Sequence, residues 1–82
     1  MMIDSDVLRK IRKVYRLTLD EMAALLRVSK SHLCRIEKNE RALTPTIRGH
    51  LVSELHLTPV KLAKILRLYD EFSVGGRGGG TS

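Results

Sequence analysis

The segment from Thr18 to Glu37, TLDEMAALLRVSKSHLCRIE, limits the possible folds of this 82-residue chain more than any other feature. Thr18 and Glu21 have the spacing of a capping box, which marks the start of a helix. The apolar residues that follow recur with the helical period: Leu19, Met22, Ala23 and Leu26. Ser29 is a good N-cap for a second helix. The segment therefore predicts two short amphipathic helices joined by a tight turn.

The second of these helices, expected at about residues 30–38, has one apolar and one polar face. Leu33 and Ile36 lie on the apolar face, and the polar face carries Lys30, Ser31 and Arg35. Two short helices that meet at a tight turn can present the second helix to the major groove of DNA. The polar face is therefore a candidate DNA-binding surface.

Three more helices are predicted, and no strand. The first begins after Asp4 or Ser5, where apolar residues again follow the helical period. Thr44-Pro45 and Thr58-Pro59 mark the other two starts, because Thr caps a helix and Pro at the first helical position gives up an N–H that has no partner. The last helix is expected to end near Phe72. The predicted fold class is all-α, with five helices.

Glycine residues give two further predictions. Gly49 lies inside the fourth predicted helix, where glycine costs about 1 kcal/mol relative to alanine, so we expect close packing there. Residues 73–82, SVGGRGGGTS, contain five glycines and predict a flexible tail. The composition is equally typical of a native tail and of an added linker. The expected organisation is a domain at 1–72 and a Gly-rich tail at 73–82.

The size and composition of the chain argue against an enzyme. A domain of this length buries only about 60% of its unfolded surface, and with one Phe, two Tyr and no Trp its core must be aliphatic. No carboxylate pair, metal cluster or nucleophile–base set is apparent, so we expect no cofactor or metal. The single cysteine, Cys34, excludes an internal disulfide and is expected to be packed or half-exposed. The chain has no long apolar run and no basic leader, which predicts a cytoplasmic protein without membrane contact.

The positive charge is concentrated in one part of the sequence. The net charge is +6, and residues 9–48 contain eleven Lys or Arg against four Asp or Glu. A basic region around two such helices favours a polyanionic partner. The alternative is a basic surface that faces only solvent.

The arrangement resembles the phage repressor/Cro family of helix-turn-helix domains, also called the xenobiotic-response-element type. The resemblance covers roughly residues 7–70 and rests on LRKIR, LTLDEMAALL, VSKSHLCRIEKNER and the Thr-Pro loop before the fourth helix. It implies a compact lambda-repressor-like domain. The chain departs from the family at Leu19, where Gln is usual, and at Arg16, Arg27 and His56, where Gly is favoured. A non-glycine residue with positive φ costs roughly 1–2 kcal/mol, and we expect positive φ at Arg27 in the turn.

The resemblance also implies residue roles. It makes Lys30, Ser31 and Arg35 base-contacting residues; His32 is a further candidate that could equally cover the turn. The expected phosphate contacts come from seven residues: Arg16, Thr18, Arg27, Ser29, Lys38, Arg41 and Arg48. Thr18 and Ser29 can cap a helix and bind phosphate at once, since helix N-termini favour anions. An ion pair between Arg12 and Glu37 is expected to brace the helix. His50 and His56 are expected to face solvent.

The last predicted helix is too apolar for a helix with one buried face. One stripe has the spacing of a helix–helix contact and is predicted to form a dimer interface: Leu62, Ile65, Tyr69 and Phe72. The alternative is that the whole helix is buried. A two-fold dimer would place two recognition helices about 34–36 Å apart, one turn of DNA.

These features together predict a sequence-specific regulator of transcription. The expected protein is a dimeric repressor of phage or mobile-element type that binds double-stranded DNA. The alternative is a protein-interaction module, such as an antitoxin or a regulator component that binds another protein through the last helix. A protein antirepressor or a toxin would then be the partner.

Overall fold

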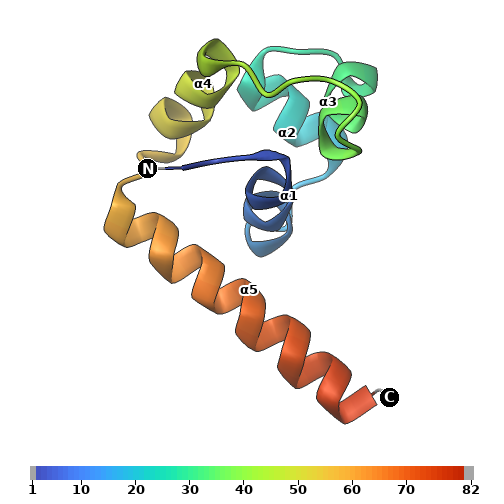
Figure 1. Ribbon diagram of the computed structural model, residues 1–82, viewed down its shortest axis with the longest axis vertical. Helices are drawn as coiled ribbons and strands as arrows, with labels where there is room; N and C mark the ends of the chain where they lie inside the picture. The colour runs from blue at the N-terminus through green and yellow to red at the C-terminus, as the bar shows by residue number, and fades with distance from the viewer. Residues whose placement is uncertain (1, 81–82) are drawn as a thin grey trace.

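The computed structural model describes the backbone of residues 2–80 and the side chains of residues 2–72. Within these residues it contains five helices and no strand, which confirms the all-α class (Figure 1). The helices are α1 (Ser5–Val14), α2 (Leu19–Leu26), α3 (Lys30–Glu37), α4 (Pro45–Leu55) and α5 (Pro59–Gly80).

The helix starts follow from side-chain caps. The Thr18 hydroxyl accepts from the backbone N–H of Glu21 at 3.0 Å, and the Glu21 carboxylate accepts from the N–H of Thr18 at 2.8 Å. This is the predicted capping box, and it satisfies two donors that the first turn leaves unpaired. Ser29 caps α3 in the same way through the N–H of His32, at 3.0 Å. Thr44 and Thr58 cap the two proline-initiated helices.

The chain leaves its first four helices through residues with positive φ. These are Arg16 (55°), Arg27 (61°), Asn39 (67°) and His56 (52°), and none is glycine. Three of the four are positions at which the sequence departs from a glycine expected by resemblance. The predicted left-handed stop at Asn39 is confirmed. The other three carry Cβ strain of about 1–2 kcal/mol each.

The core is aliphatic, as the composition predicted. The side chains with no significant exposure come from the first four helices: Leu8, Ile11, Met22, Leu26, Leu33, Ile36 and Leu51. Contacts run from α1 to α3 and α5, and from α2 to α3 and α4. Helix α1 therefore lies between α3 and α5 (Figure 1).

Part of the dimer interface predicted on α5 is wrong. Leu62 and Ile65 are only 6% and 4% exposed and belong to the core. The first half of the stripe that was expected to meet a partner therefore packs on the chain's own body. Phe72, by contrast, is 65% exposed. Tyr69 is half-buried, and its ring lies 5.4 Å from the Lys10 ammonium.

The backbone of α5 continues to Gly80, beyond the predicted end near Phe72. Extension of a formed helix needs no new nucleation, and no proline follows Pro59 to interrupt it. The side chains of 73–80 and all of residues 81–82 lie outside the described part of the chain. The flexibility expected of the segment 73–82 therefore stays a prediction.

Two smaller predictions were wrong. Gly49 is exposed, and a Cβ at this position would meet nothing within 4 Å, so close packing does not explain the glycine. His50 does not simply face solvent: its Nδ1 donates to the carbonyl of Leu26 at 3.0 Å. This bond joins α4 to the last residue of α2, whose terminal carbonyls lack helical partners.

Among residues 2–80, no helix is both long and apolar enough to cross a membrane.

Candidate nucleic-acid interface

The exposed face of α3 follows from how the helix is anchored. Leu33 and Ile36 are fully buried, and α3 packs against both α1 and α2. Side chains on the opposite side therefore point outward. Lys30, Ser31 and Arg35 are exposed, as expected. His32 and Cys34 are half-buried at the edges of this face.

The expected ion pair between Arg12 and Glu37 is present and forms two hydrogen bonds. Arg12 Nε donates to Glu37 Oε2 at 2.7 Å, and Nη2 donates to Oε1 at 3.0 Å. The third guanidinium nitrogen donates to the carbonyl of Leu17 at 3.2 Å. The two side chains are only 17% and 8% exposed, so water competes little for this bidentate contact. The pair fixes the C-terminal end of α3 against α1 and the loop before α2.

Arg35 lies between two shallow depressions on the outer face of α3. The first is lined by Leu19, Lys30, Ser31, Cys34, Arg35, Lys38 and Glu40. The second is lined by Ser29, Ser31, His32, Arg35 and Arg41. The predicted base-contacting residues are thus brought together, along with three of the predicted phosphate contacts.

Arg41 reaches α3 because the loop after the helix turns back on it. The backbone N–H groups of Glu40 and Arg41 both donate to the carbonyl of Arg35, at 2.8 and 3.3 Å. The carbonyl of Arg35 thus accepts two hydrogen bonds at the C-terminal end of α3, and these place Arg41 beside the second depression. The spacing of residues in the sequence did not predict that Arg41 lies beside α3.

The remaining predicted phosphate contacts are spread more widely. Thr18 and Arg27 are exposed at opposite ends of α2. Arg16 is exposed but lines a different depression, between α1 and α5. Arg48 is half-buried and its Nη1 donates to the carbonyl of Leu43 at 2.8 Å, so part of its guanidinium is already engaged.

Acidic groups limit the positive field near this surface. Glu40 lines the first depression, and Asp20 approaches the Lys30 ammonium at 3.9 Å with both side chains exposed. Such an exposed pair contributes little to stability. On α1, hydrogen bonds from Arg9 and Lys10 lower the pKa of Asp6 below its ordinary value. This one carboxylate offsets one of the two positive charges.

Sequence reasoning missed three residues that line the first depression: Leu19, Cys34 and Glu40. Cys34 lies four residues after Lys30, a spacing that places both on one side of a helix. This spacing could have predicted that Cys34 lies on the same surface as Lys30. Leu19 belongs to α2, and only the packing of α2 against α3 brings it to this surface.

Comparison with protein-family models, with curated proteins and with solved structures finds no match to this chain.

Proposed function

We propose that this protein is a sequence-specific regulator of transcription that binds double-stranded DNA. In this proposal α2 and α3 form a helix-turn-helix of the phage repressor/Cro type, and α3 is the recognition helix in the major groove. The observation that carries the proposal is the exposed cationic face of α3, whose opposite face is fixed in the core.

The side chains on this face suit the edges of base pairs. Arg35 is exposed at the middle of the surface, where its guanidinium can donate two hydrogen bonds to the O6 and N7 of guanine. Lys30 can donate to the same acceptors, and the Ser31 hydroxyl can donate or accept. The rigid attachment of α3 supports this role, because direct readout needs side chains held in a fixed register.

Phosphates would be bound around the base-reading face. The exposed hydroxyls of Thr18 and Ser29 lie at the N-terminal ends of α2 and α3, where the helix dipole favours an anion. Lys38 and Arg41 lie beyond the other end of α3 and would bind the backbone without regard to sequence. We propose that the regulator acts as a homodimer on a two-fold site, as a repressor of phage or mobile-element type.

A second candidate function is a protein-interaction module, such as an antitoxin. The observation that favours it is apolar exposure on α5: Val60 is 67%, Leu68 43% and Phe72 65% exposed. A module of this kind would not need the cationic face of α3.

The test is a selection from random duplex DNA, followed by binding measurements on the selected site. Arg35→Ala should weaken that complex by about 1–3 kcal/mol and reduce discrimination against non-specific DNA. Arg67→Ala removes the same charge from an exposed site on α5 and is the matched control. We expect the control to bind like the unchanged protein. Failure to enrich any sequence, or equal binding by both variants, would contradict the proposal.

A further inference from the structure

Leu19 and Cys34 place apolar surface within the cationic face of α3. Both line the first depression, together with Lys30, Arg35 and Lys38. Leu19 is the first residue of α2 and reaches this depression because α2 packs against α3. We refer to Leu19 and Cys34 as the apolar patch. It lies directly beside the residues proposed to contact bases.

The apolar patch is fixed in position and still open to solvent. Leu19 packs against the core but is only half-buried, unlike Leu26 and Leu33, which are fully buried. Cys34 is half-buried as well, and a free cysteine packs as a small apolar side chain. Part of each side chain is therefore available for contact with another molecule.

The charges near the apolar patch disfavour a phosphate at this point. Glu40 lines the same depression, and a carboxylate oxygen of Asp20 lies 3.9 Å from the Lys30 ammonium. A phosphate placed here would be repelled by these carboxylates. A neutral group fits better. Among the groups that base pairs present in the major groove, the C5-methyl of thymine is neutral and apolar.

The two sides of Arg35 differ in this respect. Among the described residues, none that lines the second depression is aliphatic: Ser29, Ser31, His32, Arg35 and Arg41. Apolar surface therefore adjoins Arg35 only on the side of Leu19. A base that lies next to the one contacted by Arg35 would meet apolar surface on this side and polar side chains on the other.

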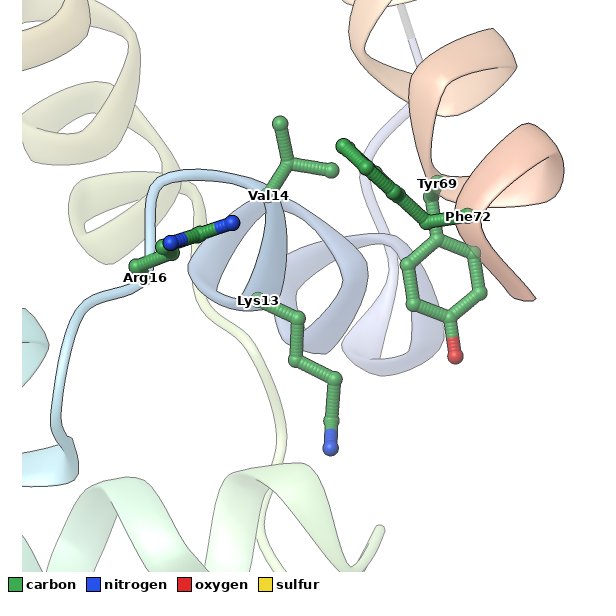
Figure 2. Close-up of a pocket in the computed structure, with 5 residues that line it drawn as sticks. All are labelled: Lys13, Val14, Arg16, Tyr69 and Phe72. Atoms are coloured by element: carbon green, nitrogen blue, oxygen red, sulfur yellow. The ribbon is translucent and has the colours of Figure 1, made fainter. Parts of the chain in front are cut away.

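Another depression on the molecule combines apolar and cationic side chains, but it lies elsewhere. Figure 2 shows it between α1 and α5, lined by Lys13, Val14, Arg16, Tyr69 and Phe72. It includes no residue of α2 or α3. Only the depression that contains the apolar patch adjoins the proposed base-reading side chains.

We infer that the apolar patch binds the C5-methyl group of a thymine next to the guanine that Arg35 reads. The inference rests on the proposed function, and it adds a residue of α2 to the specificity attributed to α3. The transfer of one such group from water to an apolar contact corresponds to about a fourfold gain in affinity.

The experiment starts from the duplex with the highest affinity in the selection described above. Each thymine is replaced in turn by uracil, which removes only the C5-methyl group. At one thymine beside the guanine read by Arg35, we expect affinity to fall about three- to fivefold. This arm leaves the protein unchanged, so loss of folding cannot produce the result.

Protein variants then identify the side chain that meets the methyl group. Leu19→Ala should bind the thymine and uracil duplexes equally, because the contact is absent from both complexes. Leu25→Ala is the matched control: Leu25 is a half-buried leucine on the same helix and lines neither depression of α3. This control and the volume-conserving Leu19→Met should both keep the preference for thymine.

The outcomes separate this inference from the proposed function. If no duplex is selected, the proposed function itself is contradicted. If a duplex is selected and Arg35→Ala loses discrimination, but no replacement by uracil weakens binding, the inference alone is overturned. It is also overturned if Leu19→Ala keeps the same preference for thymine as the unchanged protein.

Discussion

At the scale of single residues, the contact between Arg12 and Glu37 has the clearest structural effect. Its two hydrogen bonds tie α3 to α1, and both side chains are mostly buried. Loss of one partner leaves the other charge shielded from water and unpaired. Such a group costs several kcal/mol when buried in full.

We expect Glu37→Gln to lower the free energy of unfolding by about 2–3 kcal/mol, somewhat less than for a fully buried pair. Urea denaturation followed by circular dichroism measures this change. Glu54→Gln, at an exposed site on α4, is the control and should change stability by less than about 0.5 kcal/mol. If both variants unfold at the same urea concentration, the pair does not brace α3.

The positive φ angles at Arg27 and His56 allow strain and DNA binding to be separated. Both residues are exposed helix C-caps with left-handed backbones. Glycine at these positions removes the Cβ strain, which stabilises the folded state. It also increases the backbone entropy of the unfolded chain, which offsets part of that gain. Arg27→Gly and His56→Gly should therefore each raise the free energy of unfolding by about 0.5–1 kcal/mol. Thermal unfolding measures this gain.

DNA affinity should distinguish the same two variants. If Arg27 contacts a phosphate, Arg27→Gly binds DNA more weakly, while His56→Gly binds unchanged. Equal affinity for both would show that Arg27 is only a strained, solvated residue. A loss of stability in both would contradict the explanation by backbone strain.

At the scale of helices, the starts were predictable because the signals are local. A capping box or a Thr-Pro pair acts within four residues, and Thr18, Ser29, Thr44 and Thr58 all cap as expected. The exposed side of α3 was predictable for a similar reason, since the spacing of Leu33 and Ile36 defines the buried side.

The orientation of α5 was not predictable in this way. Two apolar stripes overlap on this helix, and periodicity alone does not say which one packs on α1. The structure buries Leu62 and Ile65 and leaves Leu68 exposed. Two other contacts were not predictable either. His50 bonds to Leu26, which is 24 residues away in the sequence. Arg41 bonds to Arg35 through an irregular loop whose path the sequence does not define.

Gly49 gives a prediction at the same scale. It lies in the interior of α4, is exposed, and leaves open space where a Cβ would be. Gly49→Ala should therefore stabilise the protein by about 1 kcal/mol, because alanine loses less backbone entropy in a helix. This corresponds to an increase in Tm of roughly 4–8 °C for a domain of this size. An unchanged or lower Tm would mean that glycine is required here for a reason other than helix formation.

At the scale of the whole molecule, the net charge of +6 already counts every Asp and Glu, but it does not say which of the fifteen Lys and Arg are free to meet a polyanion. Arg9 and Lys10 pair with Asp6, and Arg12 pairs with Glu37. Five exposed cations lie around α3, and Lys30 among them lies 3.9 Å from Asp20: Arg27, Lys30, Arg35, Lys38 and Arg41. A dimer would double this set.

Salt dependence reports how many of these cations meet phosphate. If a dimer forms about 6–10 phosphate contacts, the logarithm of the binding constant should fall with the logarithm of salt concentration with a slope of about −5 to −9. Fluorescence anisotropy with labelled duplex DNA measures this slope. Lys38→Ala should make the slope less steep by about 2 per dimer. A slope near zero would exclude binding through the phosphate backbone.

The most direct test of the central claim is a map of backbone amide chemical shifts during titration with a selected DNA duplex. We predict that the perturbed residues cluster between Arg27 and Arg41, centred on the exposed face of α3. We also predict that residues 60–72 of α5 show no shift that depends on DNA sequence. Perturbations confined to α5, or none with any duplex, would contradict the claim that α3 is the DNA-binding helix.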